Sequence, residues 1–216
     1  MNIVLFGPPG AGKGTQANYL VKDYNLFKIS SGDLLRDEIN DKTDLGNEIK
    51  SIINDGSFVS DIIINSLIEK NLNDKKKINK LVFDGYPRNL KQAKNLEKIF
   101  KKIKQKISCV LYLKVDKNVV VKRVSGRQIC NKCGLIFNEF FNPSNSKNHS
   151  CSVEHLIKRT DDNENVITSR YETYLTKTLP VLNYYKEKKI LHEINGNLEI
   201  NQIYKEIRTI MSFLET

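Results

Sequence analysis

The chain has 216 residues, 39% of them hydrophobic, with a formal net charge of +10 and a pI near 9.3. This length provides one sizeable α/β core with room for inserted lobes, but not for a second full domain. The basic charge is compatible with nucleic-acid binding. However, the lysines are spread through Asn-rich segments such as 75–80 and 98–106, so we favour a solvated basic surface.

The sequence carries no signs of secretion or membrane insertion. No charged segment followed by an apolar stretch opens it, and no apolar run approaches the length of a membrane span. We therefore expect a cytoplasmic protein without membrane contact. In a reducing compartment, its four cysteines favour free thiols or metal binding over disulfides.

The segment Asn2–Gln16, NIVLFGPPGAGKGTQ, combines an apolar run, a glycine-rich turn and a lysine. It predicts a buried strand over 3–6 and a helix beginning near Lys13, because glycines tolerate the backbone conformations that gather N–H groups around an anion. The helix dipole and Lys13 would complete a phosphate-binding loop, or P-loop. Gly14 stands where a hydroxyl residue is usual, and Thr15 follows, so we expect an altered or water-mediated contact with Mg²⁺. A ligand-free turn is the alternative, which would not explain the lysine.

Strands and helices then alternate along the chain. Helices are predicted over 16–24, after an N-cap at Ser31 or Asp33, and over 45–54, 61–71, 89–102 and 117–125, with strands over 27–30, 81–83 and 109–115. The helical stretch between about 30 and 59 forms a small lobe. The alternation predicts an α/β fold with a doubly wound parallel sheet. Asp84 and Arg88 follow a strand, at the sheet edge where such folds bind ligands.

The sequence pattern changes at Gly126, and helical periodicity is absent from there until about Glu164. Paired cysteines, Pro143 and Ser/Asn-rich turns predict a β-rich insertion of hairpins. Beyond it we expect one long helix over 165–188 with a kink or break at Pro180, a strand over 190–194 and a closing helix over 199–214. Cys109 is most simply a buried small residue of its strand.

Five motifs occur in the order GPPGAGKGTQ, SSGDLLR, DGYPRNLKQA, GRQICNKCG and KRTDDNE. Together they resemble the nucleoside monophosphate kinases, and more narrowly the adenylate kinase family in its long form. The resemblance covers essentially the whole chain. It implies a P-loop kinase with a CORE domain (1–29, 60–125 and 164–216), a helical AMP-binding lobe (30–59) and a β-rich LID (126–163). It also implies reversible phosphoryl transfer from ATP to AMP, giving two ADP, in adenine nucleotide homeostasis.

The resemblance also implies roles for individual residues. Those expected to act in catalysis are Lys13, Asp84, Arg88, Arg127, Arg159 and Arg170. Those expected to bind ATP are Gly10, Ala11, Gly12, Lys13, Gly14, Thr15, Arg123, Arg127, Ile136, Phe137 and Leu198. Those expected to bind AMP are Ser31, Arg36, Ser57, Phe58, Val59, Gly85, Tyr86, Pro87, Arg88, Gln92, Arg159 and Arg170. Phosphoryl transfer needs mainly positioning and charge neutralisation, which suits this set of arginines.

Asp84 is expected to organise Mg²⁺ and its waters. Asp161 and Asp162 either cap the following helix or take part in the active site.

Ser31 and Gln92 stand where pyrimidine-specific relatives usually have alanine and asparagine. Both can hydrogen-bond an adenine edge, which favours AMP as the acceptor.

Cys130 and Cys133, followed by Cys151, have the spacing of a three-cysteine zinc site. In the zinc-bearing relatives a fourth ligand comes three residues after the third cysteine, and here that residue is Glu154. His149 and His155 are alternative fourth ligands. We expect structural Zn²⁺; a LID without metal, held by hydrogen bonds and packing, is the other interpretation.

Several alternatives remain at this level. A GTP–AMP kinase, another nucleoside monophosphate kinase or a P-loop nucleotidase would share the loop. A basic zinc-ribbon protein that binds nucleic acid is the non-enzymatic alternative. We expect a monomer that binds ATP and AMP but no nucleic acid, and whose LID closes over the nucleotides about hinges near Gly126 and Asn163.

Overall fold

The computed structural model describes residues 1–54, 59–72, 77–145, 147–159 and 162–215. Its main sheet has five parallel strands in the order β2-β3-β1-β4-β8. These strands are β1 (Asn2–Phe6), β2 (Phe27–Ser30), β3 (Leu81–Asp84), β4 (Cys109–Lys114) and β8 (Leu191–Asn195). The predicted doubly wound parallel sheet is confirmed.

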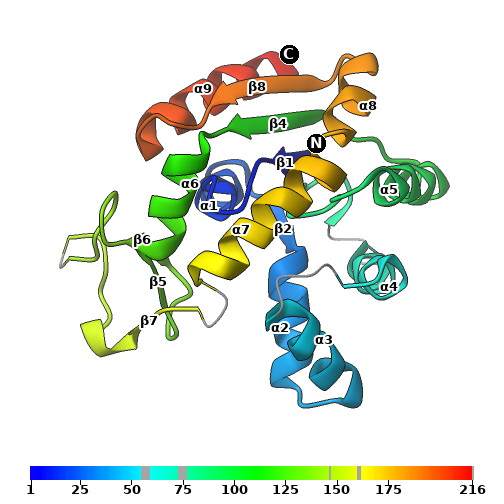
Figure 1. Ribbon diagram of the computed structural model, residues 1–216. Helices are drawn as coiled ribbons and strands as arrows, with labels where there is room; N and C mark the ends of the chain where they lie inside the picture. The colour runs from blue at the N-terminus through cyan, green and yellow to red at the C-terminus, as the bar shows by residue number, and fades with distance from the viewer. Residues whose placement is uncertain (55–58, 73–76, 146, 160–161, 216) are drawn as a thin grey trace.

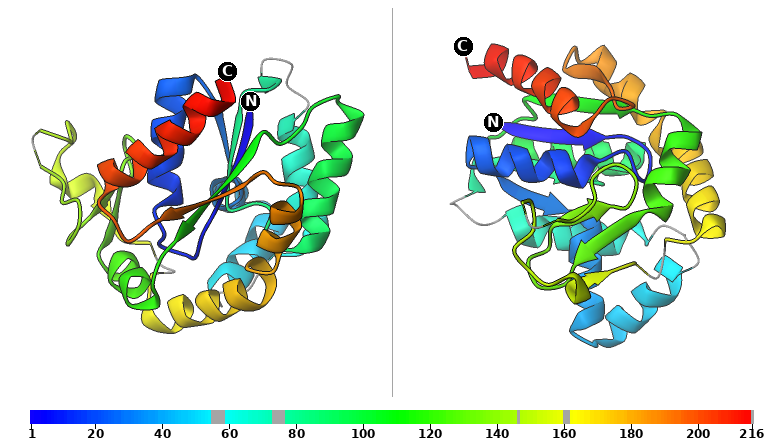
Figure 2. Two further views of the ribbon diagram at one scale, coloured as in Figure 1. Left: turned by 90° about the horizontal axis from the view of Figure 1, so that it is seen from above. Right: turned by 90° about the vertical axis from the view of Figure 1, so that its left-hand side faces the viewer.

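Helices cover both faces of this sheet (Figures 1 and 2). On one face lie α1 (Lys13–Tyr24), α6 (Lys117–Ser125) and α9 (Ile200–Glu215); on the other lie α4 (Asp61–Leu72), α5 (Leu90–Lys102) and α8 (Val181–Glu187). Within β1, Ile3 and Leu5 belong to the apolar cluster that includes residues of α1, α6 and α9. Val4 and Phe6 belong to the cluster that includes residues of α4, α5 and α8. This division follows from the alternation of side chains along a strand. The carboxyl end of β1 is thereby fixed where the P-loop begins.

Two short helices, α2 (Ser31–Asn40) and α3 (Asp44–Asn54), project from the end of β2 (Figure 1). They pack so closely that a Cβ on Gly46 would lie 2.2 Å from the carbonyl oxygen of Glu38. The prediction that Ser31 or Asp33 caps α2 is wrong. Ser30 is the N-cap, because its hydroxyl accepts a hydrogen bond from the Asp33 N–H at 3.2 Å.

The predicted β-rich insertion is a separate antiparallel sheet in the order β6-β5-β7 (Figure 1). Its strands are β5 (Arg127–Cys130), β6 (Ile136–Asn138) and β7 (Leu156–Ile157), with a short 3-10 helix, Val153–His155, before the last strand. This sheet lies beside α6, so the P-loop end of the main sheet faces the insertion.

The predicted long helix over 165–188 is interrupted. It consists of α7 (Glu164–Thr173), a π-helical turn (Tyr174–Thr178) and α8, and Pro180 is the N-cap of α8. The interruption follows from the missing N–H of proline and from the wider π turn before it. Asn163 caps α7 by accepting from the Val166 N–H at 3.0 Å, so Asp162 does not have the capping role. Within the described ranges, no helix is long and apolar enough to cross a membrane.

Candidate active site

The turn between β1 and α1 is built for close approach of the backbone. Gly7 and Gly10 have φ values of 150° and 76°. A Cβ would lie 2.8 Å from the Leu113 carbonyl oxygen at Gly7 and 2.5 Å from a methyl group of Val124 at Gly10. No side chain caps the N-terminus of α1, which begins at Lys13. The turn therefore presents N–H groups and a helix dipole to an anion, as a P-loop does.

Lys13 folds back over this turn. Its Nζ donates to the carbonyl oxygens of Gly7 at 2.8 Å and Pro8 at 2.9 Å. Burial lowers the pKa of Lys13 to about 8, with Asp84 opposing this shift and Arg88 adding to it. A bound polyphosphate would restore the charge of this lysine, because a nearby anion favours the protonated form.

The unusual Gly14 is explained by its neighbours. A Cβ at this position would lie 3.3 Å from Asp84 Oδ2 and 3.3 Å from Ile136 Cδ1, tighter than ordinary van der Waals contact. Thr15 and Asp84 both line the cavity in front of the loop. They supply the oxygen donors that Mg²⁺ and its waters prefer.

One cavity of about 620 Å³ joins the loop to the other motifs. It is lined by all the residues predicted to bind ATP: Gly10, Ala11, Gly12, Lys13, Gly14, Thr15, Arg123, Arg127, Ile136, Phe137 and Leu198. From the predicted AMP set it is lined by Arg36, Val59, Gly85, Pro87, Arg88, Arg159 and Arg170. Ser31 and Gln92 line a smaller neighbouring cavity. Ser57 and Phe58 lie outside the described residues, as does Asp161.

Comparison with known proteins bears on this arrangement. The family model for adenylate kinase matches residues 5–190. An adenylate kinase from Pelagibacter ubique is 48% identical over 98% of this chain and 99% of its own length. Adenylate kinases from Methanothrix thermoacetophila and Bacillus pumilus are 41% and 39% identical over 98% and 99% of this chain, each over 99% of its own length.

The chain belongs to the adenylate kinase family. The predicted family, enzyme class and reaction, phosphoryl transfer from ATP to AMP, are confirmed. Nothing in the comparisons favours another kinase or a nucleic-acid-binding zinc ribbon. Of the metal predictions, the structure supports a group of cysteine and histidine side chains that could hold a metal ion, described below.

In this adenylate kinase family member, Arg88 is held from several sides. Its Nε donates to the Gly85 carbonyl at 2.7 Å, and its backbone N–H donates to Gln92 Oε1 at 2.7 Å. Its carbonyl accepts from the Thr178 hydroxyl at 2.8 Å. Burial, together with the neighbouring cation Arg170, lowers the pKa of Arg88 to about 10. The site thus concentrates positive charge that an anionic substrate would relieve.

Two other arginines, Arg36 on the acceptor side and Arg127 on the LID side, have acidic partners. Arg36 pairs with Asp33, which also binds Lys28 at 3.0 Å. Burial raises the pKa of Asp33, but the two cations outweigh this effect and bring it to about 2. Arg127 donates from Nε and Nη2 to the carboxylate of Asp162, whose side chain is only 2% exposed.

Arg123 also lines the cavity. It donates to the carbonyl oxygens of Gly196 at 2.8 Å and Leu198 at 3.3 Å, and the Phe141 ring lies 5.5 Å from its guanidinium carbon. Burial lowers its pKa. The sequence predicted Arg123 and Leu198 at the donor base, but it missed Phe141, because no spacing rule links an insertion aromatic to a helix arginine.

Two further positions, Tyr86 and Thr178, refine the predicted site. Tyr86 is 1% exposed, stacks near Phe83 and donates to Asn65, so its side chain belongs to the core rather than the cavity. Thr178 was missed, because only the π turn brings its hydroxyl to the Arg88 carbonyl.

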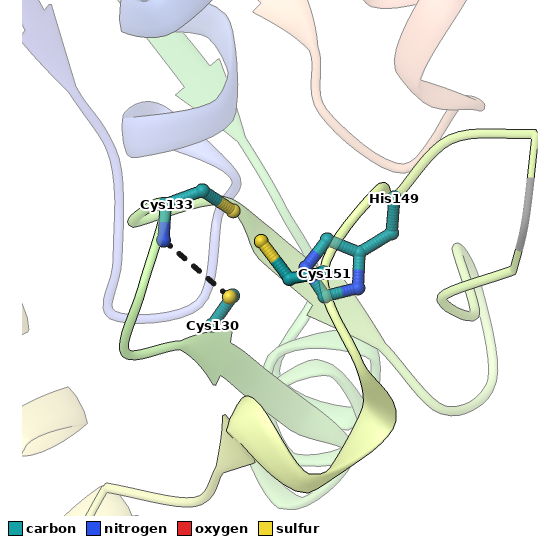
Figure 3. A group of neighbouring side chains, drawn as sticks. All are labelled: Cys130, Cys133, His149 and Cys151. Carbon is teal, nitrogen blue, oxygen red and sulfur yellow. Dashed lines mark hydrogen bonds between the residues drawn. The ribbon is translucent and has the colours of Figure 1, made fainter.

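A second cluster lies in the insertion. Cys130, Cys133, Cys151 and His149 offer ligand atoms that all lie within 4.8 Å of one another (Figure 3). The Cys133 N–H donates to Cys130 Sγ at 3.4 Å. Burial raises the pKa of the Cys130 thiol, but the N–H groups of Cys133 and Lys132 outweigh this effect and lower it to about 6. A thiolate at this position is the form that binds metal.

His149 is oriented toward the thiols. Its Nδ1 is 2.8 Å from Ser144 Oγ, whereas its buried Nε2 makes no hydrogen bond within the described part of the chain. Glu154, the predicted fourth ligand, is outside the cluster, because it lies exposed on the 3-10 turn after Cys151. His155 instead contacts Asn131 at 3.0 Å. The structure thus brings His149, one of the two alternatives, to the cysteines.

Proposed function

We propose that the chain transfers the terminal phosphoryl group of Mg²⁺-bound ATP to AMP within the 620 Å³ cavity. The observation that carries this proposal is that the P-loop, the acceptor-side arginines and the insertion arginines all line one space. Such a reaction needs no protein nucleophile, because positioning and charge neutralisation supply most of the rate.

The donor nucleotide occupies the P-loop half. The N–H groups of the turn and Lys13 bind its phosphates, and Arg123 with the carbonyl of Leu198 borders its base. Lys13 holds the charge that develops between the β- and γ-phosphates in the transition state. The position of Lys13 over the Gly7 and Pro8 carbonyls supports this role.

The acceptor nucleotide occupies the half formed by α2 and the DGYPR segment. Arg36 and Arg88 bind the phosphate of AMP, and Gln92 hydrogen-bonds to its base. Arg127, Arg159 and Arg170 surround the transferring group. Forked guanidinium groups suit this role because they bind phosphate oxygens with two donors at once.

The CORE (1–29, 60–125 and 164–216), the AMP-binding lobe (30–59) and the LID (126–163) move as units in this proposal. Closure of the LID about hinges near Gly126 and Asn163 excludes water from the phosphates. The residue pattern supports it, since Arg127 and Arg159 come from the LID whereas Lys13 comes from the CORE. Distances between labels on LID and CORE, with and without a bisubstrate inhibitor, test this movement; an unchanged distance would refute it.

Asp84 and Thr15 fit a magnesium ion, because they place carboxylate and hydroxyl oxygens beside the P-loop. Mg²⁺ supplies neutralisation of the phosphate charge when it is bound with the nucleotide. Asp84 orients the waters around it, and Gly14 leaves space for that carboxylate.

Cys130, Cys133, Cys151 and His149 fit a structural zinc ion. Three sulfur donors and an imidazole nitrogen match the preference of Zn²⁺, and the unpartnered, buried Nε2 of His149 fits a ligand atom. The ion would hold the insertion together and take no part in phosphoryl transfer.

The decisive experiment is a coupled assay of each nucleoside triphosphate with each nucleoside monophosphate. We expect ADP formation from ATP and AMP far above any other pair, dependent on Mg²⁺. Preference for a pyrimidine acceptor, or GTP as the better donor, would refute the assigned substrates.

A further inference from the structure

The side-chain amide of Gln92 is held in one orientation by two opposite partners. Gln92 is 3% exposed. Its Oε1 accepts from the Arg88 backbone N–H at 2.7 Å, and its Nε2 donates to Asp61 Oδ1 at 2.7 Å. A flipped amide would set nitrogen against the N–H and oxygen against the carboxylate. Only the observed orientation satisfies both neighbours.

Asp61 is the partner that comes from outside the acceptor motif. It is the first residue of α4, and its Oδ1 also accepts from Asn89 Nδ2 at 2.8 Å. Asn89 in turn caps α5 by accepting from the Gln92 N–H at 2.8 Å. The carboxylate therefore joins the start of α4 to the start of α5, and its charge strengthens the bond to Gln92.

The clamped amide borders the small cavity lined by Ser31, Leu35, Val59, Ile64, Gly85, Arg88 and Gln92. Ser31 donates its hydroxyl proton to the Gly85 carbonyl at 2.6 Å, so it has no proton left for a base. Gln92 retains one lone pair on Oε1 and one hydrogen on Nε2. This acceptor beside a donor complements adenine, which presents its 6-amino donor next to a ring-nitrogen acceptor. A 6-oxopurine presents a carbonyl where the amino group would be.

We propose that Asp61 is a positioning residue for acceptor specificity: its carboxylate holds the Gln92 amide in the orientation that accepts adenine and rejects 6-oxopurines. The inference rests on the proposed function, which seats the acceptor base beside Gln92. Asp61 acts through Gln92 and touches no reacting atom. Its removal should therefore change the choice between acceptors more than the rate of transfer from ATP.

The experiment compares AMP with IMP, which differ at the base but share ribose and phosphate. The variants are Asp61→Ala, which removes the acceptor, and Asp61→Asn, which retains an oxygen that can accept from Gln92. Glu69→Gln is the matched control, because it removes a negative charge from the exposed side of the same helix. Thermal unfolding of each variant separates loss of stability at the start of α4 from a change in specificity.

For Asp61→Ala we expect the AMP-to-IMP ratio of kcat/KM to fall by about tenfold, the effect of losing one hydrogen bond to a charged group. The change should lie mainly in KM for AMP, Asp61→Asn should recover most of the ratio, and Glu69→Gln should match the wild type. A ratio within about twofold of wild type in an active Asp61→Ala enzyme would overturn the inference while leaving the proposed function intact. A wild-type protein that makes no ADP from AMP would overturn the proposed function itself.

Discussion

In the main sheet, every residue of β1 is buried, and apolar clusters cover both faces. In the insertion over 126–163, three of the described residues with side chains are buried as whole residues, Cys130, Phe137 and His149, and the carboxylate of Asp162 is buried in its ion pair with Arg127. Two of these belong to the metal cluster, and the Phe137 ring lies 4.7 Å from the His149 ring. The CORE is stabilised by apolar burial, whereas the LID has almost no apolar core of its own. We propose that a metal ion held by this cluster would replace that core in the LID.

This comparison predicts that substitutions in the two regions act differently. The largest effect on activity should come from the CORE. Lys13→Met should reduce transfer by about 10³-fold or more, because it removes the charge that stabilises the transition state. Its unfolding temperature should stay close to that of the wild type, since Lys13 contacts loop carbonyls rather than the apolar clusters. Activity within about tenfold of wild type would contradict the assigned role.

Arg88→Ala should affect one substrate more than the other. Because Arg88 binds the acceptor phosphate in our proposal, KM for AMP should rise by about a hundredfold, as expected for loss of a charge-assisted pair. KM for ATP should change far less. Steady-state kinetics with each nucleotide varied in turn measures both values. Equal losses for the two substrates would contradict the division of the cavity into donor and acceptor halves.

In the LID, a pair of variants distinguishes the fourth metal ligand. His149→Ala should weaken zinc binding by at least about tenfold, because it removes the imidazole ring whose Nε2 faces the thiols. Glu154→Gln should leave zinc affinity unchanged, since Glu154 lies outside the cluster. Competition with a chelating indicator measures the affinity. The reverse order of the two variants would restore Glu154 as the ligand.

The smallest expected effect is the uptake of part of a proton when Mg²⁺-ATP binds. Burial brings the pKa of free Lys13 to about 8, and a bound triphosphate raises it again. At pH 8 about half of the lysine is deprotonated before binding, so Mg²⁺-ATP should bind with uptake of roughly half a proton. At pH 6.5 Lys13 is already protonated, and its contribution should vanish. Calorimetry in buffers of different ionisation enthalpy measures this uptake, which Lys13→Met should abolish.

The sequence predicted the CORE better than the LID for a physical reason. Alternation of apolar strands and amphipathic helices determines a parallel sheet, and the P-loop glycines are required by local backbone geometry. The arginines that line the cavity could be predicted because they lie within recognisable motifs. In contrast, His149 lies beside the cysteines because of the course of the irregular chain between β6 and Cys151, and this segment has no hydrophobic periodicity from which its course could be predicted.

Helix caps and contacts between distant side chains could not be predicted from the sequence. Ser30 and Asn163 cap α2 and α7, but neighbouring polar residues could have capped these helices equally well. Thr178 reaches the Arg88 carbonyl only through a π turn, and Asp61 reaches Gln92 only after α4 and α5 have packed together. Such pairings depend on tertiary structure rather than on spacing in the sequence.

Hydrogen exchange with and without a strong chelator tests the contrast between the two regions most directly. The amides of β5, β6 and β7 should lose protection when the metal is removed, because few apolar contacts hold those strands. The amides of β1, β3 and β4 should exchange as slowly as before, since their protection depends on the buried main sheet. Unchanged protection in the LID strands, or equal loss of protection in both sheets, would contradict the proposal that metal replaces an apolar core in the LID.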